Sequence, residues 1–187
     1  MAKLIVFNHV SLDGYFVDAN GRMDWAKMVD HDKEWNDFVA ENAKGDGALL
    51  FGRKTYELMI QYWPTPMAVK HDPVVAECMN AMRKFVVSKT LETATWSNTT
   101  LLKGDAAEEV RRLKKESSQG LCILGSGMLV ARLAEEKLID EFQVVVNPVA
   151  LGKGRTMFEG VKEKIGLKLT KMRTFKNGCA FLCYERA

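Results

Sequence analysis

The sequence predicts an α/β fold with a mainly parallel, twisted sheet that ends in an antiparallel C-terminal hairpin. Short apolar stretches bounded by turn residues alternate with stretches of helical periodicity, as they do in parallel sheets. Two of the apolar stretches, 48–51 and 121–124, contain no polar residue, which is typical of strands covered on both faces. Near the C-terminus, Asn177-Gly178 stands between two strand-like arms, and this dipeptide is a strong hairpin signal.

Length and composition restrict the class of protein. The 187 residues show no composition break or internal repeat, so we expect one domain over residues 1–187. The hydrophobic fraction of 47% and the charged fraction of 27% are average for globular proteins. A scattered net charge of +3 does not point to nucleic acid, and neither a secretory signal nor a membrane-spanning run is visible. We therefore expect a cytoplasmic protein with a small-molecule ligand and no nucleic-acid or membrane partner.

The first half of the chain begins with a strand that runs into the turn Ser11-Leu12-Asp13-Gly14. The predicted elements are, in order, a strand over residues 3–10, a helix over 32–44, a strand over 48–51 and a helix over 53–62. In the first helix, Trp35 and Phe38 belong to an apolar i, i+3, i+4, i+7 series. We expect both in the core, although both could also line a pocket.

The second half continues the alternation. Residues 64–72 hold two prolines and are predicted to form a loop. Asp105 and Glu108 form a variant of the capping box, which predicts a helix that ends near residue 117. The remaining predicted elements are a helix over 73–82, strands over 84–87 and 121–124, a helix that ends near 137 and a strand over 141–149.

Three strand-to-helix junctions combine glycine, hydroxyl and cationic residues. They are Gly52-Arg53-Lys54-Thr55, Ser88-Lys89-Thr90 and Gly125-Ser126-Gly127. In open parallel sheets, ligands bind beyond the carboxyl ends of the strands, where N–H groups at helix starts attract phosphate. The hydroxyls and cation of the second junction could hold a ribose 2′-phosphate, which favours NADPH over NADH. Each junction alone could be an ordinary polar turn, but together they predict binding of a phosphorylated nucleotide.

The same residues resemble a known family. Gly52-Arg53-Lys54-Thr55-Tyr56-Glu57 resembles the G-R-x-T-[WY]-E motif of dihydrofolate reductases. The turn Ser11-Leu12-Asp13-Gly14 resembles that of the riboflavin-biosynthesis reductase (RibD C-terminal) domain, the reductase half of a bifunctional deaminase–reductase. Gly125-Ser126-Gly127, Leu138–Glu141 and Pro148–Gly154 resemble the second half of that domain in order and spacing. No deaminase motif is present, so the resemblance is to a stand-alone reductase half.

This resemblance implies the dihydrofolate-reductase-like three-layer α/β/α fold, an NADPH cofactor and a homodimer. By matching position, the cofactor would be bound by Gly52, Arg53, Lys54, Thr55, Ser88, Lys89, Thr90, Gly125, Ser126, Gly127, Met128 and Leu129. Asn8, Ser11 and Asp13 would lie near the nicotinamide and the substrate. His9 alternates with Asn8 along the first strand, so only one of the two can face the ligand side.

The acceptor of the hydride is less well defined. Asn36 stands where dihydrofolate reductases carry the carboxylate that holds the pterin, and Leu124 stands where riboflavin-type reductases carry a glutamate. The resemblance implies a reductase of a ribosylamino-pyrimidine or another small heterocycle. Dihydrofolate reduction and a non-catalytic NADPH-binding module are the alternatives. Trp25 and Tyr56 are candidates to line the substrate pocket.

Reduction also requires a proton, and Asp13 is the candidate catalytic group because the turn should hold its carboxylate near a strand end. A bound water could serve instead, and Asp13 could simply close its own turn through a side-chain bond. No metal site is predicted, since the histidines are dispersed and the four cysteines form no CxxC pair.

Overall fold

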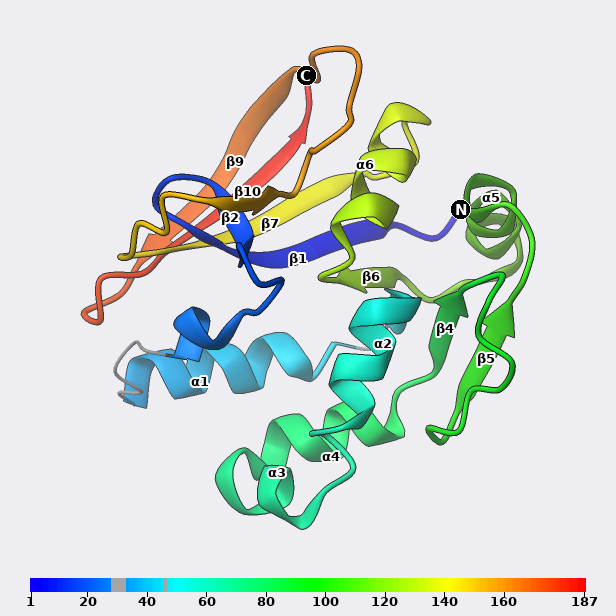
Figure 1. Ribbon diagram of the computed structural model, residues 1–187, viewed down its shortest axis with the longest axis horizontal. Helices are drawn as coiled ribbons and strands as arrows, with labels where there is room; N and C mark the ends of the chain where they lie inside the picture. Colours follow the sequence, from blue (N-terminus) through cyan, green and yellow to red (C-terminus); the bar gives the residue numbers. More distant parts are fainter. Residues whose placement is uncertain (28–32, 46) are drawn as a thin grey trace.

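The computed structural model describes residues 1–27, 33–45 and 47–187. Its centre is an eight-stranded sheet with the order β5-β4-β3-β6-β1-β7-β10-β9 (Figure 1). The first six strands of this order pair in parallel. They are β5 Thr99–Leu102, β4 Lys84–Val87, β3 Ala48–Gly52, β6 Leu121–Leu124, β1 Leu4–Ser11 and β7 Glu141–Asn147. The predicted α/β fold with a mainly parallel sheet is therefore confirmed.

The C-terminal hairpin completes the sheet. β10 (Ala180–Arg186) pairs antiparallel with β7, and β9 (Leu167–Thr174) pairs antiparallel with β10 and forms the sheet edge. Gly178 in the connecting turn has φ +86, a conformation that glycine adopts without steric cost. The hairpin predicted from Asn177-Gly178 is confirmed.

Helices cover both faces of the sheet (Figure 1). The helices are α1 Lys33–Ala43, α2 Arg53–Ile60, α3 Pro66–His71, α4 Pro73–Ala81, α5 Ala106–Glu116 and α6 Gly127–Glu135. α5 and α6 pack on one face, where Val110 and Leu133 join a large buried cluster with Leu4 and Leu50 from the sheet. α1 to α4 cover the other face. In this described part of the chain, none of the helices has the length and apolarity to span a membrane.

The core on the α1–α4 face is divided into two clusters. Under α1, Trp35 and Phe38 pack against Phe181 of β10, so both are core residues as expected. Under α2 and α4, Tyr56 packs with Phe51 of β3 in a separate cluster. The central strands β1 and β6 lie between these clusters and carry side chains that are only partly buried.

Several elements differ from the prediction. A two-stranded ribbon of β2 (Tyr15–Asp18) and β8 (Gly154–Thr156) was not predicted, because these short segments pair across the length of the chain. The predicted loop over 64–72 was wrong in part: Thr65 caps α3, and Pro66 occupies its first turn, where proline needs no N–H partner. Asp105 caps α5 as predicted, with its carboxylate accepting from the next helical N–H groups. Position 32, the predicted start of the first helix, lies outside the described residues.

Candidate functional site

Two of the three predicted junctions meet at the carboxyl edge of the sheet. The Ser126 hydroxyl accepts a hydrogen bond from the Gly52 N–H at 2.8 Å and donates to Thr55 Oγ1 at 2.8 Å. Thr55 Oγ1 also accepts from the Ser126 N–H at 3.0 Å. We call these three contacts among Gly52, Thr55 and Ser126 the hydroxyl bridge. The bridge fixes the start of α2 against the start of α6.

The loop that enters α6 has an uncommon backbone. Gly125 has φ +62 and Ser126 has φ +59, so two successive residues are in the left-handed region. A side chain at Gly125 would lie 3.0 Å from Thr55 Cγ2, and one at Gly127 would lie 2.5 Å from Phe16 Cε1. Both glycines are therefore required by close packing. The left-handed Ser126 is held in place by the hydroxyl bridge.

Both helix starts leave backbone donors available. Neither α2 nor α6 has a side-chain cap. Within the described part of the chain, the N–H groups of Gly127, Met128 and Leu129 donate to no protein acceptor, and the same holds for the first residues of α2. The first N–H groups of a helix carry a partial positive charge. Two helix starts held side by side can therefore bind the oxygen atoms of a phosphate group.

Exposed cations surround these helix starts. Arg53 is part of a surface ion pair with Glu57 at 3.0 Å, and Lys54 is exposed beside it. An exposed ion pair of this kind contributes little free energy, so Arg53 can exchange Glu57 for an anionic ligand. At the junction Ser88-Lys89-Thr90, Lys89 and Thr90 are exposed. The hydroxyl of Ser88 accepts from Thr90 N–H at 3.2 Å and Leu91 N–H at 2.9 Å, which matches the ordinary polar turn.

Asn8 of β1 stabilises the loop between β6 and α6. Its side chain is 1% exposed; Oδ1 accepts from the Gly125 N–H at 2.7 Å, and Nδ2 donates to Met157 Sδ at 3.1 Å. We expected Asn8 at the substrate. Its amide is instead used within the protein, because it orients the loop ahead of α6. The alternation along β1 therefore leaves His9 on the α1 face.

Asp13 joins two loops. Its carboxylate accepts hydrogen bonds from the Ser11 hydroxyl at 2.6 Å and from the N–H groups of Leu151 at 3.1 Å and Gly152 at 2.7 Å. These bonds, led by that of Ser11, lower the pKa of Asp13 to about 2. At neutral pH the group is therefore an ionised acceptor. This geometry does not support the expected role as a proton donor and matches the alternative in which Asp13 closes its own turn.

The other expected substrate residues are buried within the protein. Tyr56 is 2% exposed, and its hydroxyl accepts from the Trp96 N–H at 2.9 Å, so its expected place at the substrate is corrected to the core. Ser11 is 1% exposed and also accepts from the Tyr15 N–H. Trp25 is 6% exposed, and its indole N–H donates to the Arg22 carbonyl at 3.3 Å. Apolar periodicity at Tyr56 and the turn before Trp25 could not distinguish a pocket from the core.

Sequence reasoning missed the apolar strip between the two clusters of the α1–α4 face. Phe7 of β1 and Leu124 of β6 are paired in register, and both are only partly buried. Phe7 packs against the cluster under α1, and Leu124 packs against the cluster under α2 and α4. Leu124 directly precedes Gly125. The strip therefore ends next to the loop that carries the hydroxyl bridge, so an apolar surface lies beside the open N–H groups of α6.

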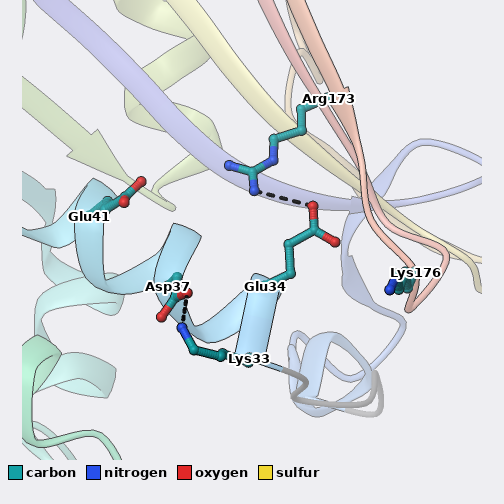
Figure 2. Close-up of a pocket in the computed structure, with 6 residues that line it drawn as sticks. All are labelled: Lys33, Glu34, Asp37, Glu41, Arg173 and Lys176. Atoms are coloured by element: carbon teal, nitrogen blue, oxygen red, sulfur yellow. Dashed lines mark hydrogen bonds and ion pairs between the residues drawn. The ribbon is translucent and has the colours of Figure 1, made fainter.

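A separate hollow of about 500 Å³ lies between α1 and the hairpin (Figure 2). It is lined by Lys33, Glu34, Asp37, Glu41, Arg173 and Lys176. Figure 2 shows the Arg173–Glu34 pair at 3.2 Å and the Lys33–Asp37 pair at 2.6 Å. Three cations and three acids line this hollow, so it has no net attraction for a phosphate. This balance of charge makes it a poorer candidate site for an anionic ligand.

The sheet order and the edge loops define an α/β protein of the dihydrofolate-reductase-like type. The chain belongs to the RibD C-terminal domain family, whose model matches residues 2–181. It is 30% identical over 183 residues to the uncharacterized protein YyaP of Bacillus subtilis (strain 168), a match that spans 98% of this chain and 94% of YyaP. The uncharacterized protein YwjB of the same organism is 25% identical over 173 residues, 92% of each chain.

Solved structures share the fold. A crystal structure from Shewanella sp. PV-4, described as a riboflavin biosynthesis protein, has a TM-score of 0.75 and 24% identity, with 100% of this chain and 99% of that chain covered. The Thermotoga maritima diaminohydroxyphosphoribosylaminopyrimidine deaminase/5-amino-6-(5-phosphoribosylamino)uracil reductase has a TM-score of 0.68 and 15% identity, with 100% of this chain and 57% of that chain covered. The family and fold expected from the motifs are therefore confirmed.

The contacts of Asp13 predict a pH dependence of stability. The folded-state pKa lies below the ordinary 3.8, so the carboxylate stabilises the fold above that value, and the contribution is lost as the pH falls through about 2. We expect Asp13→Asn to be less stable than the wild type at neutral pH, with the difference shrinking between pH 3.8 and 2. Urea unfolding at a series of pH values measures it, with the exposed Asp37→Asn as control. A difference that stays constant over this range would contradict the assignment.

Proposed function

We propose that this protein is an NADPH-dependent reductase that transfers hydride to a small heterocyclic or ribosylamino-pyrimidine acceptor. The hydroxyl bridge is the observation that supports this proposal most strongly, since it holds two helix starts with open N–H groups at one edge of the sheet. Membership of the RibD C-terminal domain family supports reductase activity, and the structural neighbour from Thermotoga maritima is named a deaminase/5-amino-6-(5-phosphoribosylamino)uracil reductase.

The residues present fit the dinucleotide. Gly125 and Gly127 let the loop ahead of α6 pack closely against Thr55 and Phe16, and Met128 and Leu129 contribute N–H groups at the start of the helix. Gly52 and Thr55 hold this loop, while Arg53, Lys54 and Lys89 bring positive charge. Bound NADPH would supply the hydride, and the protein would orient it against the acceptor and exclude water. We further propose a cytoplasmic homodimer.

The apolar strip is the position that we propose for the acceptor. Phe7 and Leu124 offer a half-buried apolar surface next to the phosphate-binding loop, which suits a flat heterocycle. The Asp13 carboxylate is engaged with the loop after β7, so it is already used within the protein.

Turnover tests the proposed function. The protein is mixed with NADPH and either 5-amino-6-(5-phosphoribosylamino)uracil or dihydrofolate, and the absorbance of the reduced nicotinamide is followed. We expect consumption with the pyrimidine. Consumption of NADPH with dihydrofolate alone would mean that the acceptor is a pterin and not a pyrimidine. Tight binding without consumption of NADPH by either acceptor would contradict the reductase and leave a nucleotide-binding module.

A second prediction concerns cofactor choice. We expect Arg53→Ala to weaken NADPH binding by roughly 10- to 100-fold, because a charge-assisted hydrogen bond contributes about 1.5–3 kcal/mol. NADH, which lacks the 2′-phosphate, should be weakened much less. Titration calorimetry with both coenzymes measures this, and Arg112→Ala on α5, another exposed cation in surface ion pairs, is the control. Equal weakening of the two coenzymes would mean that Arg53 does not read the 2′-phosphate.

A further inference from the structure

His9 lies on β1 beside the apolar strip, and nothing in the proposed function uses it. Its ring contacts Phe7 and Trp35 edge-on, with centroid separations of 5.7 and 6.0 Å. It points to the α1 face, opposite to the buried Asn8. Because Phe7 is paired with Leu124, the residue before Gly125, His9 is two residues further toward the carboxyl end of the same strand. It therefore lies where the strip approaches the phosphate-binding loops.

Asn147, at the end of β7, has an amide group whose orientation is fixed. Its side chain is fully buried, and Nδ2 lies 3.1 Å from both the Val10 and Val145 carbonyl oxygens. A carbonyl oxygen can only accept, so these two contacts identify this atom as the N–H donor. Oδ1 faces the other way and accepts from the Cys179 thiol at 3.7 Å. The neighbours leave no alternative orientation of the amide with satisfied hydrogen bonds.

This orientation fixes the tautomer of His9. Asn147 Nδ2 lies 3.3 Å from His9 Nδ1, and its two N–H groups are shared with the Val10 and Val145 carbonyls. An amide nitrogen cannot accept a hydrogen bond, so Nδ1 does not donate in this contact and turns its lone pair toward the amide. In a neutral imidazole one nitrogen accepts and the other carries the proton, so the proton is on Nε2. Burial of the ring lowers the pKa of His9 to about 4 and keeps it neutral at pH 7. The ring is thus a hydrogen-bond donor through Nε2 only.

Nε2 is available to a ligand. His9 is not fully buried, and no residue in the described ranges bonds to its Nε2. Every fully buried side-chain nitrogen and oxygen atom of those ranges does have a partner, so Nε2 is an accessible donor. Its surroundings are the aromatic rings of Phe7 and Trp35. A donor in apolar surroundings binds an acceptor atom more strongly than one in water.

We propose that His9 donates its Nε2–H to the acceptor of the reductase and thereby holds and polarises the bond that is reduced. This inference rests on the proposed function and specifies its substrate class: a flat heterocycle or sugar-derived imine with a C=N or C=O group at the strip. Hydride adds to the carbon of that group, and the electron pair of the π bond moves to the heteroatom. His9 offsets the charge there, and a water molecule supplies the proton that completes the reduction. Asn147 is a positioning residue that keeps Nε2 protonated.

Two substitutions test the role. His9→Phe removes the donor but suits the aromatic surroundings, whereas His9→Gln keeps an amide N–H close to the position of Nε2. With NADPH and 5-amino-6-(5-phosphoribosylamino)uracil, we expect His9→Phe to lower kcat roughly 100-fold and His9→Gln to restore much of it. The Kd for NADPH should stay unchanged in both. His71→Gln, at an exposed histidine of α3, is the control. Wild-type turnover by His9→Phe would overturn the proposal.

Nitrogen-15 NMR of the histidine side chains provides a readout that does not depend on turnover. We expect a neutral Nε2–H signal for His9 at pH 7, and a shift of that signal when the pyrimidine is added with NADPH. A neutral Nδ1–H form, or no shift on addition of the pyrimidine to a protein that binds NADPH, would overturn the role of His9. Absence of NADPH binding by calorimetry would instead contradict the proposed function, so the two failures are distinguishable.

Discussion

The hydroxyl bridge between Thr55 and Ser126 is the interaction on which the site depends. It joins the first turn of α2 to the loop ahead of α6, so it fixes the relative position of two helix starts that follow neighbouring strands. The same contacts hold Ser126 in the left-handed region and keep Gly52 close to it. The open N–H groups of the two helix starts therefore lie at the same edge of the sheet.

Successive side chains of β1 point to opposite faces of the sheet, so Asn8 and His9 contact different parts of the candidate site. Asn8 faces the α5–α6 side and orients the loop at Gly125, whereas His9 faces the α1 side next to the apolar strip. Adjacent residues of one strand thus support the two parts of the proposed site. The division of the opposite core into two clusters leaves the strip between them only partly buried. In the proposed function, this strand lies between the cofactor and the acceptor.

Much of the fold followed from local patterns. The strands 84–87 and 121–124, the cap at Asp105 and the hairpin at Asn177-Gly178 agree with the structure because their signals lie within a few residues of one another. The ribbon of β2 and β8 depends on a pairing between Tyr15 and Thr156, which no local pattern reveals. Helix α3 was not predicted, because Pro64 and Pro66 together are typical of a loop, although proline is also common in the first turn of a helix.

The carboxyl ends of parallel strands share one edge of a sheet, which predicted that the junctions at Gly52 and Gly125 lie together. The hydroxyl bridge shows this contact. Sequence could not reveal which polar side chains are used within the protein. Ser88 closes its own turn, and Asp13 bonds to Gly152, 139 positions away along the chain. Asn8, and not His9, was predicted to face the substrate, although alternation gives opposite faces without saying which face holds the ligand. The structure shows instead that the Asn8 amide bonds to the loop at Gly125.

Titration calorimetry of NADPH with the wild type, Thr55→Ser and Thr55→Val tests whether cofactor binding depends on the hydroxyl bridge. Serine keeps the hydroxyl of the bridge, whereas valine keeps the shape and removes it, which leaves the Ser126 N–H without its partner at a cost of about 1–3 kcal/mol. We expect similar NADPH affinity for the wild type and Thr55→Ser, and an affinity about tenfold or more weaker for Thr55→Val, with its circular dichroism spectrum unchanged. Equal affinity in all three proteins, or no binding by the wild type at millimolar NADPH, would contradict this expectation.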